Sequence, residues 1–162
     1  MTPIVLSSLS LRPTLAADLP ILFEFQKDPE YDHMAAFTKQ DSSEKQSYLA
    51  KWTRLLGDPT ITSKTILADG QIVGSVGMWL MDGEPQVTYG IDRSSWGQGL
   101  ATAALRLFLE EVKIRPLHAS AAFDNAGSMR VLEKCGFQKI GVERAFANAR
   151  GAEIEEMIFV LR

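Results

Sequence analysis

The sequence predicts a single-domain α/β (α+β) fold, with a mixed, mostly antiparallel sheet of about six to seven strands and about four flanking helices. Three observations lead to this prediction. The spacing of apolar residues alternates along the chain between the strand period and the helical period. Short turn sequences join consecutive β-rich stretches, which is typical of an antiparallel meander. The chain of 162 residues, 46% hydrophobic and 23% charged, has the size and composition of one soluble globular domain.

The first elements expected are a strand and two helices. Residues 9–11 alternate between apolar and polar side chains, as a short half-buried strand would. Apolar residues at helical spacing predict a helix over Leu15–Lys27, which Asp28-Pro29 ends. Asp41–Glu44 has the spacing of a capping box and predicts that a second helix follows. Trp52 lies on the apolar face of this helix, where it either packs in the core or lines a pocket.

A β-meander is expected in the middle of the chain. Ile61–Ala68 and Gln71–Trp79 are β-rich, and Asp69-Gly70 between them is the favoured pair of a type I′ hairpin. Asp82–Pro85 is expected to form the next turn, and Gln86–Asp92 the third strand. Consecutive strands joined by such short turns pair antiparallel.

The C-terminal half alternates helices and strands. Gly99–Val112 is a strongly amphipathic helix, and a strand is expected over Leu117–Phe123. A further helix is expected over Asn125–Cys135, where a glycine follows as a stop. Two closing strands are expected near Gln138–Phe146 and Glu153–Leu161. The predicted order is therefore β α α β β β α β α β β over the whole of residues 1–162.

Composition excludes several classes of function. The net charge of −3 argues against a nucleic-acid-binding protein. Cys135 is the single cysteine and cannot form an intramolecular disulfide, which indicates a reducing compartment. His33 and His118 are far apart and lack other soft ligands nearby, so a zinc site is not expected. Without an apolar stretch long enough for a membrane span or a signal-peptide pattern, the chain is expected to be cytoplasmic.

Two glycine- and asparagine-containing segments carry the functional signal. Trp96–Thr102 lies between a predicted strand and a predicted helix, where Gly97 and Gly99 can point backbone N–H groups at a phosphate. Asn125 can N-cap the later helix, with Ser128 one turn further on. Each segment also has a purely structural interpretation, as a glycine turn or as a capped helix start. A dinucleotide fingerprint and a P-loop are excluded, because the third glycine and the P-loop lysine are missing.

Taken together, WGQGLAT, a strand and FDNAGSMRVLEKCGF closely resemble the GNAT acetyltransferase superfamily. Within it, the chain is similar to the RimJ/RimL-like branch of ribosomal-protein N-terminal alanine acetyltransferases. The opening LRPTLAADLPILFEFQKDPEY and the closing RGAEIEEMIFVLR resemble that branch too, so the likeness covers nearly the whole chain. It implies splayed central strands and acetyl-CoA as co-substrate. The oligomeric state is left open between a monomer and a homodimer, since an exposed edge of the sheet could pair in a dimer. A primary amine, either a peptide N-terminus or a small molecule, would attack the thioester directly in a ternary complex.

The resemblance also implies roles for individual residues. Asn125 and Ser128 are the implied catalytic residues; Ser128 carries the nearest hydroxyl in that helix and is a candidate to orient or protonate the sulfur. The residues implied to bind acetyl-CoA are Tyr89, Gly90, Ile91, Trp96, Gly97, Gln98, Gly99, Leu100, Ala101, Thr102, Asn125 and Ser128.

The chain departs from the family where proton transfer is concerned. Leu132 stands where the family often has a tyrosine that acts as general acid. Gln86 stands where branch members often have a glutamate. Gln86 cannot act as a base, and Glu84 is expected in a turn as a solvated carboxylate. The general base is therefore open, and a catalytically weak acyl-CoA-binding sensor or scaffold remains the alternative function.

The resemblance gives only candidates for the residues that bind the amine acceptor. His33, Phe37 and Gln86 are the candidates for binding the amine, although a surface histidine is the simpler interpretation of His33. Cys135 could form an acetyl-cysteine intermediate, but a helix C-terminus disfavours a thiolate, and a buried structural cysteine is expected. His118, on a strand, is expected to be a hydrogen-bonded structural histidine.

Overall fold

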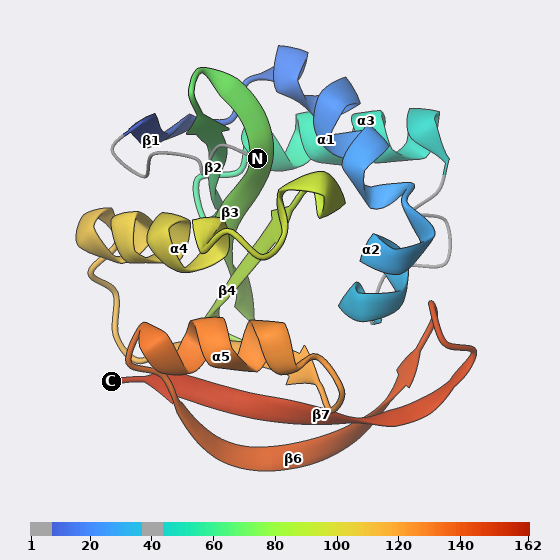
Figure 1. The fold of residues 1–162 in the computed structure, drawn as a ribbon, viewed down its shortest axis with the longest axis vertical. Coiled ribbons are helices and arrows are strands. Elements are labelled where there is room, and N and C mark those ends of the chain that lie inside the picture. The colour runs from blue at the N-terminus through green and yellow to red at the C-terminus, as the bar shows by residue number, and fades with distance from the viewer. Residues whose placement is uncertain (1–7, 37–43) are drawn as a thin grey trace.

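The computed structural model describes residues 8–36 and 44–162, and these form a seven-stranded sheet with helices on both faces (Figure 1). The strands are β1 (Leu9–Pro13), β2 (Thr62–Ala68), β3 (Gln71–Met81), β4 (Glu84–Ile91), β5 (Leu117–Ala122), β6 (Gln138–Ala147) and β7 (Ala152–Leu161). The described helices are α1 (Leu19–Gln26), α2 (Pro29–Ala35), α3 (Lys45–Leu56), α4 (Leu100–Glu111) and α5 (Ala126–Lys134), with 3-10 turns η2 (Ala16–Asp18) and η3 (Arg93–Ser95). The predicted mixed α/β fold class is confirmed.

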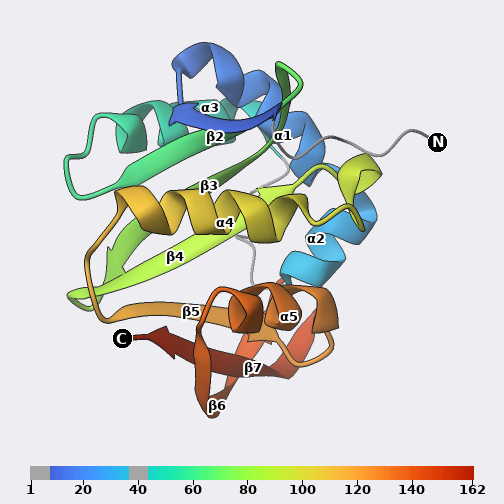
Figure 2. The ribbon, with the colours of Figure 1, turned by 60° about the vertical axis from the view of Figure 1, so that its left-hand side comes forward.

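The sheet has two halves that meet at a single pair of residues. The strand order is β1-β2-β3-β4-β5-β7-β6, and every neighbouring pair is antiparallel except β4 and β5. β4 and β5 are parallel and pair only at Gln86 and His118. Figure 2 shows the two strands close together at one end and apart at the end near α2. The expected splay of the central strands is confirmed.

The meander turns follow the sequence prediction with one correction. Asp69 and Gly70 have φ angles of 50° and 77°, and Asp82 and Gly83 have φ angles of 52° and 81°. Two successive residues at positive φ are what a type I′ turn requires. The second turn is therefore the pair Asp82-Gly83 alone, and the prediction of a turn over Asp82–Pro85 was wrong. Glu84 already lies in β4, paired with Met81.

One helix was missed near the N-terminus. The helix expected over Leu15–Lys27 begins later, because Leu15 is extended and η2 precedes α1. Asp28-Pro29 ends α1 but also starts α2. The Asp28 carboxylate accepts the backbone N–H groups of Glu30 and Tyr31, and Pro29 fits the first helical position. The expected capping box falls partly on residues 41–43, outside the described residues.

A partly buried ion pair joins β1 to the start of α1. Arg12 donates to both oxygens of Asp18 at 2.6 and 2.9 Å. The same carboxylate accepts the Leu15 N–H at 2.8 Å and the Thr65 hydroxyl at 2.9 Å. These hydrogen bonds, the Arg12 bond first among them, lower the pKa of Asp18 to about 2. Asp18 is only 3% exposed, and this network links η2 to β1 and β2.

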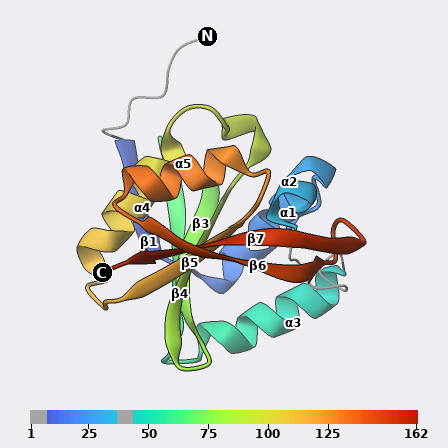
Figure 3. The same ribbon diagram turned by 90° about the horizontal axis from the view of Figure 1, so that it is seen from below.

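The main core lies between the sheet and the pair α4 and α5. Figure 3 shows these two helices on one face of the sheet and α3 on the other. Leu105 and Phe108 of α4 are fully buried against strand residues such as Phe159. On the other face, Trp52 of α3 is half-buried, and its ring centroid lies 6.2 Å from that of Tyr48. Trp52 therefore packs against Tyr48 of its own helix and lies outside the main core. None of the described helices has the length and apolar character of a membrane span.

Candidate functional site

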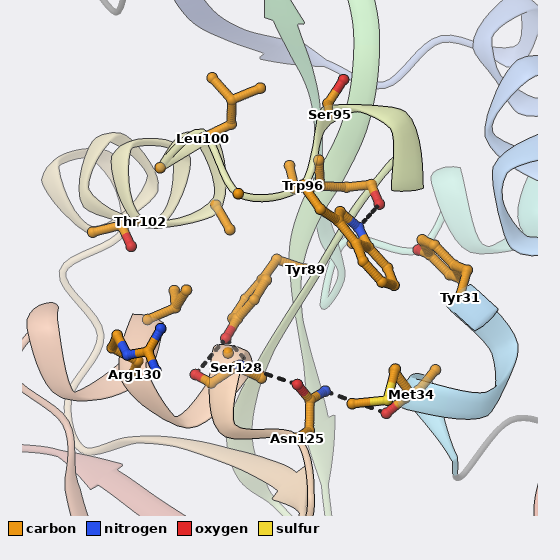
Figure 4. Close-up of a pocket in the computed structure, with 18 of the residues that line it drawn as sticks. Tyr31, Met34, Tyr89, Ser95, Trp96, Leu100, Thr102, Asn125, Ser128 and Arg130 are labelled. Carbon is orange, nitrogen blue, oxygen red and sulfur yellow. Dashed lines mark hydrogen bonds between the residues drawn. The ribbon is translucent and has the colours of Figure 1, made fainter.

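A cavity of about 530 Å³ lies where β4, α2 and the N-terminal ends of α4 and α5 meet (Figure 4). Its lining residues come from segments far apart in the sequence. They are Tyr31, Met34, Ala35, Tyr89, Gly90, Ile91, Ser95, Trp96, Gly97, Gly99, Leu100, Ala101, Thr102, Asn125, Gly127, Ser128, Arg130, Val131 and Lys134. The cavity therefore joins the glycine-rich loop to the edge of β4 and to the start of α5.

The glycine-rich loop turns β4 into α4 through two left-handed residues. Gly97 and Gly99 have φ angles of 80° and 75°, which side chains rarely adopt, and Gly99 is the N-cap residue of α4. A Cβ at either position would meet open space, so backbone groups are accessible there. The Trp96 indole N–H donates to the Ile91 carbonyl at 2.7 Å and holds the loop against β4. The free N–H groups and the positive end of α4 thus face the cavity, which suits a phosphate.

A hydrogen-bonded group of side chains lies at the other end of the cavity (Figure 4). The Tyr89 hydroxyl lies 2.7 Å from Ser128 Oγ and also donates to the Ser128 carbonyl at 3.1 Å. Asn125 caps α5, because its Oδ1 accepts the Ser128 N–H at 3.1 Å, and its Nδ2 donates to the Met34 carbonyl at 3.3 Å. Burial raises the pKa of Tyr89 to about 12, so its hydroxyl stays protonated near neutral pH.

Two glycines allow α2 and β3 to approach β4 closely. A Cβ at Gly90 would overlap the Tyr31 hydroxyl, and a Cβ at Gly74 would overlap the Gly90 carbonyl. Burial raises the pKa of Tyr31 to about 12. The Tyr31 ring therefore forms the α2 wall of the cavity, next to Trp96 (Figure 4).

Most residues predicted to bind a ligand line this cavity. The exception in the loop is Gln98, which lies outside the lining and whose buried Oε1 has no hydrogen-bond partner in the described part of the chain. Leu132 is fully buried in the core, so its position gives no access to the cavity. Gln86 is buried at the meeting point of β4 and β5 rather than in the cavity.

Of the predicted acceptor residues, His33 and Gln86 are not among the residues that line the cavity. The side chain of His33 is exposed on α2, and its carbonyl accepts the Arg150 Nε–H at 2.8 Å. Arg150 in turn forms a bidentate pair with Asp124, so it ties α2 to the start of α5. Phe37 lies outside the described residues.

Sequence analysis missed the contributions of α2 and of the exposed side of α5. Tyr31, Met34 and Ala35 carried no signal, because α2 itself was not predicted. On α5, however, the lining residues recur every three or four positions and therefore share one face of the helix: Gly127, Arg130, Val131 and Lys134. That spacing could have identified two cations at the cavity, Arg130 and Lys134.

The two remaining candidates are Cys135 and His118, and neither lines the cavity. Cys135 is half-buried rather than buried, and its Sγ lies 3.7 Å from the Thr102 carbonyl. Burial raises the pKa of its thiol, which disfavours a nucleophilic thiolate. His118 Nε2 lies 3.8 Å from a carboxylate oxygen of Glu84, and its Nδ1 is buried without a hydrogen-bond partner among the described residues.

Comparisons with known proteins agree on one family. Residues 8–138 match the family described as acetyltransferase (GNAT) domain. The chain is 24% identical over 163 residues to the uncharacterized N-acetyltransferase p20 of Bacillus licheniformis, covering 94% of this chain and 92% of that protein.

Solved structures share the fold. Mycobacterium smegmatis RimJ in complex with CoA-disulfide matches with a TM-score of 0.79 and 20% identity, over 94% of this chain and 81% of that chain. Spermidine N-acetyltransferase from Vibrio cholerae, in complex with CoA and spermine, matches with a TM-score of 0.77 and 17% identity, over 95% and 96%.

Proposed function

The chain belongs to the GNAT acetyltransferase family, and from this premise we propose that it is a single-domain enzyme that transfers the acetyl group of acetyl-CoA to a primary amine. The acceptor is a peptide N-terminus or a small-molecule amine, which attacks the thioester directly in a ternary complex. The observation that carries this proposal is the cavity, since it links the N-terminal end of α4 to β4 and α5. One continuous site can therefore hold both ends of an extended acyl-CoA.

The residues around the loop fit the diphosphate of coenzyme A. Gly97 and Gly99 have the left-handed backbone that exposes N–H groups, and neither position leaves a side chain in the way. Arg130 and Lys134 add two cations to the lining on the opposite wall. We assign the diphosphate to the start of α4, with Trp96, Leu100, Ala101 and Thr102 shaping the loop.

The splay between β4 and β5 fits the pantetheine arm. Because the strands pair only at Gln86 and His118, the β5-facing edge of β4 beyond this point has no strand partner in the described part of the chain. Backbone groups of Tyr89, Gly90 and Ile91 are therefore proposed to bind the two amides of the arm in the manner of an added strand. Trp96 already uses the Ile91 carbonyl.

Acetyl-CoA supplies the activated acetyl group, and the protein supplies positioning and protons. Asn125 is proposed to orient the sulfur end of the arm, because it lines the cavity and hydrogen bonds hold both its Oδ1 and its Nδ2 in place. Ser128 is proposed to donate its hydroxyl proton to the leaving sulfur. The single proton of the Tyr89 hydroxyl can go either to the Ser128 carbonyl or to Ser128 Oγ. When it goes to Oγ, the Ser128 proton is free to point into the cavity.

A screen of primary amines tests the proposal. The purified protein is mixed with acetyl-CoA and single amines, among them alanine amide and spermidine, and release of the CoA thiol is followed. Acetylated amine in the product, identified by mass spectrometry, is the expected result. If acetyl-CoA binds but no amine is acetylated across the panel, the alternative function of a sensor or scaffold replaces this one.

A further inference from the structure

The face of the sheet that turns away from α4 and α5 carries polar side chains on its central strands. Leu117 and Ala119 of β5 belong to the core beneath α4 and α5. Because side chains alternate along a strand, His118 and Ser120 point to the opposite face. The register of β5 with β7 puts Glu156 on this same face, since it pairs with Ala122.

This polar face has two structural limits. At one end, Ala36 after α2 packs with Ala122 of β5 and Ile154 of β7. At the other end, Gln86 and His118 form the single pair between β4 and β5. The residues between these limits border the opening between β4 and β5, on the face of the sheet away from the glycine-rich loop.

Glu156 lies at the Ala122 end of this face, and Ser120 lies midway between the two limits. Ser120 is two residues beyond the β4–β5 pair, roughly 7 Å along β5 at the usual rise of a strand. It is exposed, as is Thr88 at the corresponding place on β4. The side chain of Ser120 hydrogen-bonds to Glu156. Glu156 pairs with Ala122, which lies four residues beyond the β4–β5 pair, as Gly90 does on β4. The carboxylate is therefore level with Gly90, next to Tyr89, whose hydroxyl contacts Ser128 at the proposed sulfur end of the arm.

Among the described residues, no cation forms an ion pair with Glu156. Glu143 of β6 pairs directly with it across the strands, and like charges in this position repel. Neither carboxylate forms an ion pair in the described ranges 8–36 and 44–162. Burial raises the pKa of Glu156, Glu143 raises it further, and the hydrogen bond from Ser120 opposes both effects. His118, also on this face, has its Nε2 3.8 Å from a carboxylate oxygen of Glu84.

Resting on the proposed function, we infer that Glu156 is the catalytic base: it receives the ammonium group of the acceptor, and Ser120 holds its carboxylate in position. The acceptor is then a primary amine that arrives as a cation, on the face of the sheet opposite α4 and α5. Glu143 adds to the attraction, because a second carboxylate stabilises a cation placed between them.

The proton and electron transfers balance without any further reactant. The ammonium gives one proton to a carboxylate oxygen of Glu156, and the freed nitrogen lone pair forms the bond to the acetyl carbonyl carbon. The carbon–sulfur bond breaks with its electron pair on sulfur, which takes the Ser128 hydroxyl proton and leaves as the thiol. The nitrogen loses its second proton as the amide forms, this proton passes through water to restore the Ser128 hydroxyl, and Glu156 returns its own proton to solvent.

A matched pair of variants tests this role. Glu156→Gln removes the charge but keeps the shape of the side chain. Glu155→Gln makes the same change next to it, on the opposite face, where Glu155 is exposed and pairs with Arg144. Alanine amide serves as the acceptor, because its amine has a pKa of about 8 and can be neutralised by raising the pH.

The expected result separates base catalysis from structural damage. Glu156→Gln lowers kcat/KM for alanine amide at neutral pH by about 100-fold or more, and the deficit shrinks as the pH rises above the pKa of the amine. Stabilisation by acetyl-CoA in thermal unfolding stays at the wild-type value. Glu155→Gln keeps wild-type kinetics, and Ser120→Ala falls between the two. Removing the repulsion with Glu143 should leave Glu156→Gln at least as stable as the wild type.

A binding measurement accompanies the kinetics and needs no turnover. Butylammonium chloride is titrated into the acetyl-CoA-saturated protein, and the carboxyl carbon of Glu156 is followed by NMR, with Glu156→Gln identifying the signal. A saturable shift in the wild type is expected. The role of Glu156 is overturned if no shift occurs, or if Glu156→Gln and Glu155→Gln have equal kinetics at every pH. A wild-type protein that acetyl-CoA does not stabilise would instead overturn the proposed function.

Discussion

Replacing Ser128 with alanine removes one hydroxyl from the cavity and little else. The hydroxyl lies 2.7 Å from the Tyr89 hydroxyl, whereas the cap of α5 uses the backbone N–H of Ser128 and the Asn125 side chain. Ser128→Ala therefore keeps the cap. Tyr89 also keeps the Ser128 carbonyl, which accepts its hydroxyl proton at 3.1 Å. The substitution thus tests proton donation without dismantling the start of α5.

The expected magnitudes differ sharply between stability and rate. Loss of the bond to Tyr89 costs about 1 kcal/mol, which lowers the unfolding midpoint of a chain of this length by roughly 2–4 °C. If Ser128 protonates the leaving sulfur, kcat should fall by about 100-fold, which corresponds to roughly 2.7 kcal/mol in the transition state. Binding of acetyl-CoA should change little.

The assay compares Ser128→Ala with Tyr89→Phe under saturating acetyl-CoA. Tyr89→Phe removes both hydrogen bonds of the phenol but leaves the Ser128 hydroxyl in the cavity. It should cost more stability than Ser128→Ala and less kcat. A Ser128→Ala protein with wild-type kcat would refute the role of Ser128, and so would rate losses that simply follow the losses of stability.

Two further predictions concern the loop and the edge of the sheet. Gly99→Ala should weaken acetyl-CoA binding by about tenfold in a calorimetric titration, because its φ of 75° is strained for alanine by about 1–2 kcal/mol. Gly141→Ala, also facing open space but without positive φ, should bind normally. The lowered pKa of Asp18 contributes about 2 kcal/mol of stability above its ordinary pKa of 3.8, lost as the pH falls through about 2. In acid unfolding, Asp18→Asn should lack this contribution, and an unchanged pH dependence would contradict it.

The regular parts of the fold were predictable because their signals are local. The Asp69-Gly70 pair requires two residues at positive φ, and the structure has them there. The amphipathic pattern of residues 99–112 and the glycine at position 136 gave the limits of α4 and α5 to within a residue or two. These elements depend on contacts between neighbours in the sequence, so a single chain is enough to predict them.

What could not be predicted depends on contacts between distant segments. The Asp28-Pro29 pair was interpreted only as the end of a helix, although the same aspartate caps α2. Tyr31 reaches the cavity because Gly90, far along the chain, has no side chain to exclude its hydroxyl. No periodicity reports such a close approach.

The candidate site was predictable where it is built from continuous segments. Loop residues 96–102 and the pair Asn125 and Ser128 were singled out from the sequence, and all of them except Gln98 line the cavity. Glu156 escaped notice because its neighbours Ser120 and Glu143 come from other strands. Its surroundings exist only once β5, β6 and β7 are in register.

The central claim is that acetyl-CoA binds along the loop and the splayed edge of β4. Thermal unfolding with acetyl-CoA, and with ATP and NADH as controls, tests it most directly. At about 100 times its dissociation constant, a ligand adds roughly 2.7 kcal/mol, which should raise the midpoint by several degrees, at about 2–4 °C per kcal/mol. The account predicts this rise with acetyl-CoA alone. No rise at saturating acetyl-CoA, or an equal rise with ATP, would contradict it.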